Sequence, residues 1–441
     1  MSINVSKNQH EVSGLEFQTN SLPRLDEWKN YSLSEITDPN RPISYGIVQT
    51  GPNIINGIPC LRVVDIVGGV IKTDNLIRTS ASISESYRRT VLKSGDLVIP
   101  LRGKVGEIGY IDNDLAGANL TRGVALISVR PDFSSKYVKH YLSSKACADR
   151  FLASMNGSAL QEITISTLRQ FKVSLPSLPE QTAIANALSD VDALIQELEK
   201  LIAKKQAIKT ATMQQLLTGR TRLPQFAHHP DGRKKGYKPS ELGEIPEDWE
   251  VGALGDVAEV RMCKRVLSHQ TSKTGDIPFF KIGTFGGEPD AFIPMSLYLE
   301  FKSKYSFPEK GDVLISAAGT LGKTVIFDGS PSYFQDSNIV WLQIDKLKLI
   351  NEFLFHYYNI IEWASSEGST ISRLYNGIIK ASLIRLPTTE EQSSITKMLD
   401  DLDEEIQAIE QRLNKTRQIK QGMMQELLTG KTRLVKPAGV A

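Results

Sequence analysis

The chain repeats one segment of its own sequence. Residues 175–223 and 386–434 align without a gap at an offset of 211 residues, and close to half of their positions are identical. Both copies begin with Leu-Pro, continue with Glu-Gln, and finish with Leu-Leu-Thr-Gly, one basic residue and Thr-Arg-Leu. A fixed offset of this length indicates two copies of one structural unit, so the fold must accommodate that unit twice.

Each copy of the repeat is predicted to form a long helix. It follows a proline or acidic residue and ends at Thr-Gly, because glycine fits the left-handed position just after a helix. A helix from about Glu180 to Leu217 would be roughly 57 Å long. Apolar residues spaced by three and four form a coiled-coil seam at Ile184, Leu188, Val191, Ile195, Leu198 and Ile202, and at Ile395, Leu399, Leu402, Ile406, Ile409 and Leu413.

The seam predicts that each helix packs against one apolar partner, and the other copy is the obvious candidate. Polar and charged residues cover the remaining faces. Lys205 and Lys209, with their counterparts Thr416 and Lys420, interrupt the seam. For this pattern taken alone, an ordinary helix of a bundle remains the alternative.

A globular stretch precedes each predicted helix, at roughly residues 20–174 and 245–385. Both stretches start near a tryptophan, Trp28 and Trp249, and share an Ile-Pro pair, a Gly-Asp pair before an apolar run, and two glycines after that run. Strands are predicted at 97–100, 123–129, 313–316 and 338–344, and helices near 137–152 and 352–364. The framework recurs while the residues between differ, which describes one mixed α/β domain present twice.

The predicted organisation is therefore a first α/β domain (1–174), a first long helix (175–223), a linker (224–244), a second α/β domain (245–385), a second long helix (386–434) and a tail (435–441). The linker is rich in proline, glycine and charge, and its histidines His228 and His229 are expected to be solvated. Residues 1–20 and the tail carry no recognisable signal.

Composition narrows the classes of function. The 52 basic and 50 acidic residues leave a net charge of +2, so a DNA-binding chain would need its basic residues gathered on one face. The three cysteines lie far apart and form no metal or redox pair. No apolar run approaches the roughly 18 residues of a membrane span, and the start lacks a signal-peptide pattern, so we expect a cytoplasmic protein.

Motifs of DNA-modifying enzymes are missing from the sequence. It contains no Asn-Pro-Pro-Tyr or Asp-Pro-Pro-Tyr methyltransferase motif, no Gly-x-Gly-x-x-Gly loop and no His-Glu-x-x-His. Gly322-Lys323-Thr324 matches the end of a phosphate-binding loop, but Ala317 occupies the first glycine position, so a turn after a strand is the better account. We predict no catalytic residue and no metal site.

The sequence resembles the DNA-specificity subunits of Type I restriction-modification systems. The resemblance covers about residues 22–434 and depends on the doubled Leu-Pro, Glu-Gln and Leu-Leu-Thr-Gly landmarks, together with Arg-Lys-Lys-Gly-Tyr-Lys at 233–238 and Glu-Ile-Pro-Glu-Asp-Trp at 244–249. It implies two target-recognition domains in a pseudo-twofold arrangement, each reading one half of an asymmetric split DNA target, joined by two antiparallel coiled-coil helices.

The same resemblance implies what the partners supply. Two modification subunits would dock on the helices and methylate adenine with S-adenosylmethionine, and restriction subunits would use ATP for translocation and cleavage. This chain would hold no cofactor and would not be an enzyme. The recurring Thr-Gly-[Arg/Lys]-Thr-Arg ends are expected to help dock the modification subunits.

The predicted helix length is compatible with a split target. A helix of roughly 57 Å is long enough to hold two domains on half-sites that lie about one DNA turn, roughly 34 Å, apart.

Candidate DNA-contacting residues can be named from side-chain chemistry, since arginine matches guanine, asparagine matches adenine and lysine holds phosphate. They are Arg88, Arg89, Arg102, Lys104, Asn119 and Arg122 in the first domain, and Arg265, Lys281, Lys323 and Asn338 in the second. For any single residue, a solvated surface charge is the competing interpretation.

Two other functions remain open on the sequence alone. A coiled-coil scaffold that never touches DNA would lack a continuous basic face on the two α/β domains. An enzyme with an unrecognised site would place convergent ionisable groups in a cleft.

Overall fold

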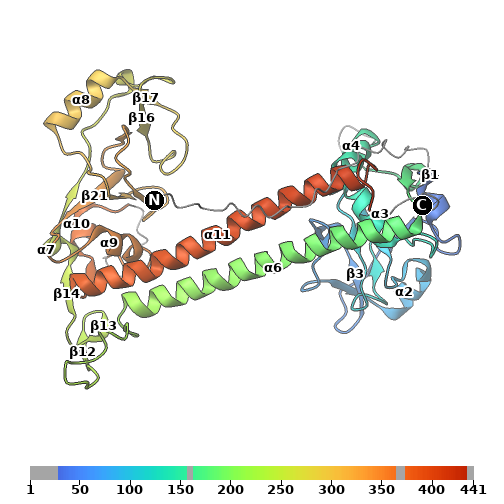
Figure 1. Ribbon diagram of the computed structural model, residues 1–441, viewed down its shortest axis with the longest axis horizontal. Coiled ribbons are helices and arrows are strands. Elements are labelled where there is room, and N and C mark those ends of the chain that lie inside the picture. Colours follow the sequence, from blue (N-terminus) through green and yellow to red (C-terminus); the bar gives the residue numbers. More distant parts are fainter. Residues whose placement is uncertain (1–27, 156–161, 364–372, 435–441) are drawn as a thin grey trace, which may run out of the picture. The chain divides into compact units, whose positions relative to one another are not determined.

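The computed structural model describes residues 28–155, 162–363 and 373–434. The chain divides into two compact units: unit 1 contains residues 1–197 and 413–441, and unit 2 contains residues 198–412. Each unit combines one α/β body with part of both long helices, α6 (Leu178–Leu217) and α11 (Thr389–Leu427), as Figure 1 shows. Residues 1–20 and the tail at 435–441, in which the sequence carries no recognisable signal, lie outside the described residues.

The body of unit 1 is built around a four-stranded sheet in the order β2-β10-β7-β8, with a three-stranded sheet β6-β3-β9 beside it. Strands β7 and β10 are buried along their whole length, because every residue in both is apolar or proline. The elements are β1 (Lys29–Ser32), α1 (Leu33–Ile36), β2 (Ser44–Tyr45), β3 (Ile58–Leu61), β4 (Ile66–Val67), β5 (Val70–Ile71), β6 (Ile77–Thr79), α2 (Ala81–Ser86), β7 (Leu97–Pro100), β8 (Gly109–Tyr110), β9 (Asn119–Leu120), β10 (Val124–Ile127), α3 (Ser135–Leu142), α4 (Lys145–Ala153), α5 (Ile165–Gln170) and β11 (Lys172–Leu175).

The body of unit 2 repeats this plan with β15-β21-β18-β19 and a second sheet β17-β16-β20. In both bodies the central strand of the second sheet pairs with one neighbour in antiparallel and the other in parallel. The elements are β12 (Tyr237–Ser240), β13 (Gly243–Pro246), β14 (Glu250–Ala253), α7 (Leu254–Val257), β15 (Ala258–Arg261), β16 (Ile277–Phe280), β17 (Phe292–Ile293), α8 (Met295–Lys304), β18 (Val313–Ser316), β19 (Thr324–Ile326), β20 (Tyr333–Phe334), β21 (Ile339–Ile344), α9 (Asn351–Tyr357), α10 (Asn376–Ala381) and β22 (Leu383–Leu386).

One prediction about local structure was wrong, and the predicted linker contains regular structure. The helix expected near 137–152 is broken into α3 and α4, because Ser144 accepts a hydrogen bond from the Cys147 backbone at 3.3 Å and so starts a new helix. The stretch expected to be a linker contains the antiparallel hairpin β12–β13. Within that stretch His229 Nε2 lies 2.8 Å from Glu247 Oε1, so this side chain is in contact with a carboxylate rather than simply solvated.

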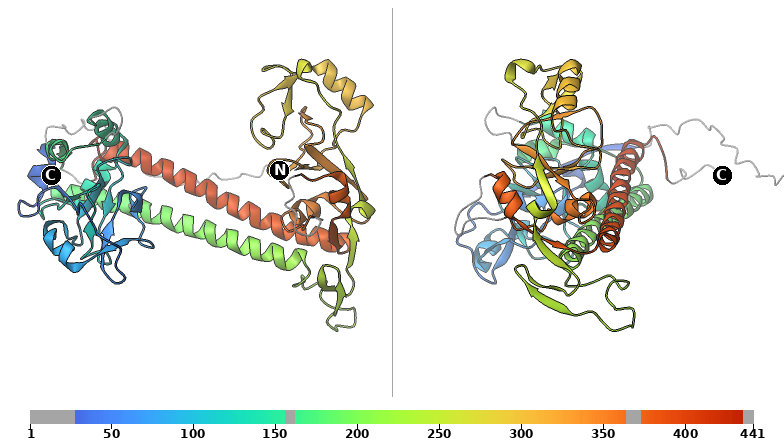
Figure 2. Two further views of the ribbon diagram at one scale, coloured as in Figure 1. Left: turned by 180° about the vertical axis from the view of Figure 1, so that it is seen from behind. Right: turned by 90° about the vertical axis from the view of Figure 1, so that its left-hand side faces the viewer.

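The long helices lie side by side and antiparallel within each unit, as both views of Figure 2 show. In unit 2, Lys205 on α6 pairs with Glu405 on α11 at 2.7 Å, and Lys209 pairs with Asp403 at 2.5 Å. Residue numbers therefore rise along α6 where they fall along α11, which makes the two helices antiparallel. In unit 1, Lys420 pairs with Asp192 at 2.5 Å. The lysines that interrupt the apolar seam therefore form ion pairs between the helices.

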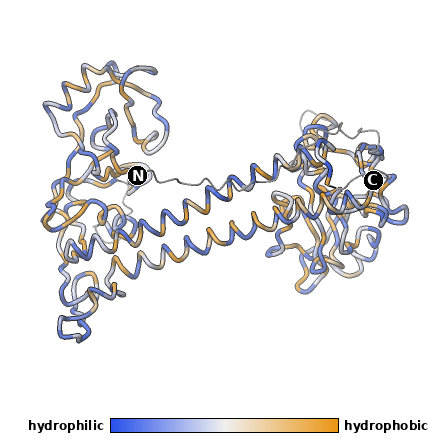
Figure 3. Tube along the Cα trace, viewed as in Figure 1, coloured by the Kyte–Doolittle hydropathy of each residue, from blue (hydrophilic) through white to orange (hydrophobic). Residues whose placement is uncertain are grey.

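The twelve predicted seam residues are all buried or half-buried. Ile184 and Leu188 belong to the core of the body of unit 1, and Ile395 and Leu399 belong to that of unit 2. The first turns of each helix therefore pack into an α/β body as well as along the helix pair. Figure 3 shows apolar residues recurring at short intervals along both helices. Among the described helices, none has the long apolar stretch needed to cross a membrane.

A buried ion pair fastens the end of one long helix to the start of the other. In unit 2, Arg222 follows α6 and bonds Glu391 in the first turn of α11, with Nε 2.9 Å from Oε1. Glu391 is 1% exposed and also accepts the indole N–H of Trp249 at 2.9 Å. In unit 1, Arg433 bonds Glu180 in the same way. We call these two contacts the latches.

The neighbouring glutamine of each Glu-Gln pair holds the helix to its α/β body. Gln181 accepts the backbone N–H of Ser134 at 3.0 Å, just before α3. Gln392 accepts the N–H of Ile350 at 3.0 Å, just before α9. Both repeated residue pairs therefore have a structural role within the chain, and so do the Thr-Arg ends.

The latch of unit 2 should be essential for its stability. Changing Arg222 to Met leaves the Glu391 carboxylate buried without its cation, a loss of about 3–5 kcal/mol for a buried pair. We expect Arg222→Met to lower the free energy of unfolding of unit 2 by at least about 3 kcal/mol, measured by hydrogen exchange in peptides around Trp249.

Arg220→Met is the matched control, because Arg220 is exposed and two residues away. It should leave exchange near the wild-type rate. Equal exchange in both variants and the wild type would show that the latch contributes nothing.

A buried histidine makes unit 1 sensitive to acid. His140 on α3 is 2% exposed, and its Nε2 lies 3.1 Å from the Ser189 hydroxyl on α6. Burial lowers the pKa of His140 to about 4, and nearby Lys139 and Lys420 act in the same direction while Asp192 opposes them. The folded state therefore resists taking up a proton that the unfolded chain binds at its ordinary pKa near 6.5.

We expect unit 1 to lose stability as the pH falls from about 6.5 to about 4, because the unfolded state binds more protons in that window. The loss should be on the order of a few kcal/mol and should show as faster hydrogen exchange in α3. His140→Gln should weaken this pH dependence, whereas the equivalent change in unit 2, His356→Gln, should not alter exchange in α3. An unchanged acid response in His140→Gln would refute the assignment.

Candidate nucleic-acid interface

In unit 1 the loop between β9 and β10 lies beside the glycine loop after β7. The Gly123 carbonyl accepts the Leu101 N–H at 2.9 Å, which joins the two loops. This contact brings Arg122 next to Arg102, although the two are far from adjacent in sequence. A Cβ on residue 123 would lie 3.7 Å from Arg102 Nε and 3.0 Å from Val63 Cγ2, so a glycine leaves room for the guanidinium there.

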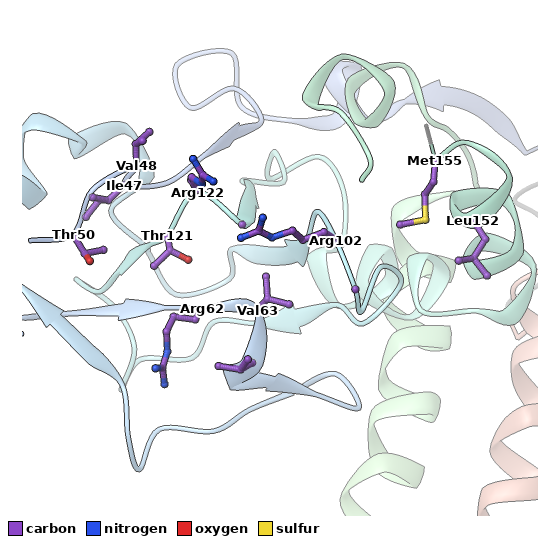
Figure 4. A pocket seen from close by; sticks show the side chains of 13 residues that line it. Ile47, Val48, Thr50, Arg62, Val63, Arg102, Thr121, Arg122, Leu152 and Met155 are labelled. Carbon is purple, nitrogen blue, oxygen red and sulfur yellow. The ribbon is translucent and has the colours of Figure 1, made fainter. Parts of the chain in front are cut away.

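Arg102 and Arg122 border two adjoining hollows on the surface of unit 1. The larger hollow has a volume of about 970 Å³ and is also lined by Thr50, Arg62 and Leu152. Figure 4 shows the arginines around it, with Leu152 and Met155 at its other side. Arg62 is held by Asp65 at 2.8 Å. Within the described residues, Arg102 and Arg122 have no hydrogen-bond partner for their side chains.

This arrangement suits a polyanion that also offers hydrogen-bond acceptors. Two guanidinium groups without internal partners can each donate a pair of parallel hydrogen bonds. The hollow combines them with the hydroxyls of Thr50 and Thr121 and with apolar side chains, as expected for contact with phosphates, base edges and thymine methyl groups.

The other candidates in unit 1 do not join this cluster. Arg88 and Arg89 are exposed on the turn after α2 and line neither hollow. Lys104 donates to the Ile66 carbonyl at 3.0 Å and thereby anchors the β4–β5 hairpin. Asn119 is fully buried, where it accepts from Thr90 at 2.7 Å and donates to Ser84 at 3.2 Å. Asn119 is therefore not accessible to DNA in this conformation.

In unit 2 the candidates are more dispersed. Lys281 pairs with Asp290 at 2.8 Å, and Lys323 donates to the Phe285 carbonyl at 2.5 Å. Asn338 is half-buried in the loop between β20 and β21. Arg265 is exposed and pairs with Asp336 of the same loop at 2.8 Å. The structure thus brings together Arg265 and the loop of Asn338, but leaves Lys281 and Lys323 engaged elsewhere.

Three residues of these sites were missed on the sequence alone. In unit 2, Asp336 lies in the β20–β21 loop and Arg373 donates to that loop, and in unit 1 Arg62 lines the larger hollow. These residues come from loops that are far apart in the sequence, so no motif contains them. Arg62 alone could have been suspected, because it follows the Ile-Pro pair that both α/β domains share.

A possible metal-binding group also occurs in unit 2, formed by His356, Asp400 and Asp403. His356 Nε2 lies 2.9 Å from Asp400 Oδ1. Asp403 is already paired with Lys209 at 2.5 Å, so the lysine ammonium group supplies the positive charge that a metal ion would bring to this carboxylate. We therefore assign this cluster to the contact between α9 and the long helices.

Comparison with known proteins gives the family. The family model described as "Type I restriction modification DNA specificity domain" matches residues 26–210 and 246–418, most of both units. A protein of Haemophilus influenzae named as a type I restriction enzyme specificity subunit is 40% identical over 280 residues, which cover 64% of this chain and 67% of that protein. The EcoBI specificity subunit of Escherichia coli is 29% identical over 180 residues, 40% of this chain and 37% of that one.

Solved structures share the fold. A chain from a study of complex assembly and conformational transition in a type I restriction-modification system has a TM-score of 0.54 at 19% identity, over 94% of this chain and 100% of that chain. The S subunit from M. genitalium has a TM-score of 0.53 at 16% identity, over 94% of this chain and 98% of that one. The α/β body present twice and the two long helices agree with these folds. The chain belongs to the family of type I restriction-modification DNA specificity subunits.

Proposed function

We propose that this chain recognises a split, asymmetric DNA target, with one half-site contacted by each unit, and holds the modification and restriction subunits of a type I restriction-modification enzyme at that target. The chain itself performs no chemistry in this proposal. Adenine methylation with S-adenosylmethionine and ATP-dependent cleavage belong to the partner subunits.

One observation carries the proposal: the two units share a framework but differ in charge at the same loop. Unit 1 places Arg122 in the loop between β9 and β10 with Arg102 beside it, whereas unit 2 places Asp336 in the loop between β20 and β21 with Arg265 beside it. Two domains that share a fold but recognise different half-sites need different side chains at the loop that contacts DNA. A scaffold that never touched DNA would have no need of Arg102 and Arg122, whose side chains have no hydrogen-bond partner among the residues that the structure describes.

The experiment is to co-express the chain with the modification subunit encoded beside it and to map adenine methylation on a plasmid library. We expect methylation at a single split motif that disappears without this chain. The double variant Arg102→Ala/Arg122→Ala should relax one half of the motif only. Each bidentate arginine contributes about 1–3 kcal/mol of base discrimination, so the affected base pairs should lose roughly 5- to 150-fold of preference.

The matched control is Arg88→Ala/Arg89→Ala, which removes two exposed arginines of the same unit outside the hollows. It should leave both halves of the motif intact. Assembly of a complex that methylates no motif would contradict the proposal and favour a protein scaffold.

A further inference from the structure

The loop between β9 and β10 of unit 1 has a counterpart in unit 2, the loop between β20 and β21, so the two loops can be compared. In unit 2 the Ala317 N–H donates to the Asn338 carbonyl at 2.7 Å, as Leu101 donates to Gly123 in unit 1. The strands before the loops also match, because β20 and β9 each lie parallel to the central strand of their sheet. Residues 335–338 of unit 2 therefore correspond to residues 121–123 of unit 1.

The loop of unit 2 is held in an unusual backbone conformation. Ser337 has φ +54°, in the left-handed region that is strained for a residue other than glycine. Arg373 Nη2 donates to the Ser337 carbonyl at 2.7 Å, and the Asn338 N–H donates to the Asp336 carbonyl at 2.6 Å. Gln335 adds an acceptor for the Ile282 N–H at 2.9 Å. These contacts fix the loop, and with it the position of the Asp336 carboxylate.

That carboxylate holds one side of an exposed guanidinium. Arg265 Nε donates to Asp336 Oδ2 at 2.8 Å, while the side chains of Arg265 and Asp336 are 66% and 16% exposed. Among the residues that the structure describes, neither Nη atom of Arg265 has a hydrogen-bond partner. An ion pair whose cation is largely exposed contributes little to stability, so stability does not explain why a strained loop presents this carboxylate.

We propose that Arg265 is a guanine-reading residue of unit 2 and that Asp336 is its positioning residue. This rests on the proposed function. With Nε held by Asp336, the two Nη groups form a preorganised fork that matches the O6 and N7 acceptors of guanine. Adenine presents a donor at the corresponding position, which the fork would reject. Because Asp336 offsets the charge, the pair adds little attraction to phosphates and acts mainly through base discrimination.

The test uses the chain in complex with its modification subunit and a panel of duplexes in which each base pair of the target is changed in turn. The wild type should prefer G·C at one position of one half-site by roughly 5- to 150-fold. Arg265→Ala and Arg265→Lys should both remove that preference, because lysine keeps the charge but lacks the fork. Every other position, including the whole other half-site, should keep its preference.

Asp336→Asn should weaken the same preference while raising affinity for non-specific DNA and its salt dependence, because it leaves the charge of Arg265 without its counter-charge. A merely structural defect would weaken binding to both kinds of DNA. Arg261→Ala is the matched control, because Arg261 on β15 is also paired with a carboxylate, that of Glu259, but its guanidinium donates to Gln343 on β21 rather than to Asp336. It should leave every preference intact.

Three outcomes would separate the possibilities. Equal weakening on all duplexes in Arg265→Ala, with the slope of log affinity against log salt reduced by about one, would make Arg265 a phosphate contact and overturn the inference. Unchanged binding and specificity would make it a simple surface ion pair, which also overturns it. If the wild-type complex itself shows no split motif, the proposed function fails, and the inference fails with it.

Discussion

The two buried latches are the contacts on which the rest of the structure depends. Each one joins an arginine just after one long helix to a glutamate in the first turn of the other. The glutamine after each glutamate then ties the same helix start to an α/β body. Because a charge buried in this way is stable only when it is paired, separating the two helix ends would leave a buried glutamate without its cation, and the latches therefore act together with the apolar seam in favouring the antiparallel pairing.

The repeat made much of this architecture predictable. The Glu-Gln and Thr-Gly landmarks gave both long helices to within a few residues, and glycine 219 does adopt the left-handed conformation expected after a helix, with φ +73°. The strands at 97–100 and 313–316 were also predicted correctly. These elements are strongly patterned over their own length, so local sequence is enough to define them.

The features that the sequence alone did not predict depend on contacts between segments that are far apart in the chain. The hairpin β12–β13 was taken for a linker because its composition is polar, yet Lys235 and Arg222 both bond Asp248 and hold it in unit 2. The sequence alone did not show that the arginines of the Thr-Arg ends form the latches, and the expected role of these ends in docking other subunits stays a prediction. Chemistry alone made Asn119 and Lys104 candidates for DNA contact, and only the fold shows that one is buried and the other anchors a hairpin.

The two units illustrate how one framework can hold different readers. Strand pairing, the loop after the parallel strand and the links to the long helices recur, while the charges beside the loop do not. Specificity can therefore change in one unit without disturbing the contacts that keep the units folded, since the latches involve none of the proposed DNA-contacting residues.

The central claim, that one helix pair carries two separate readers, is tested most directly by lengthening that pair. Seven residues would be inserted after Ile202 and seven more after Ile409, so that the apolar seam is kept, and the methylated motif would be mapped again. The account predicts both half-sites unchanged and a gap longer by about three base pairs, from roughly 10 Å of added helix. An altered half-site with an unaltered gap would contradict it.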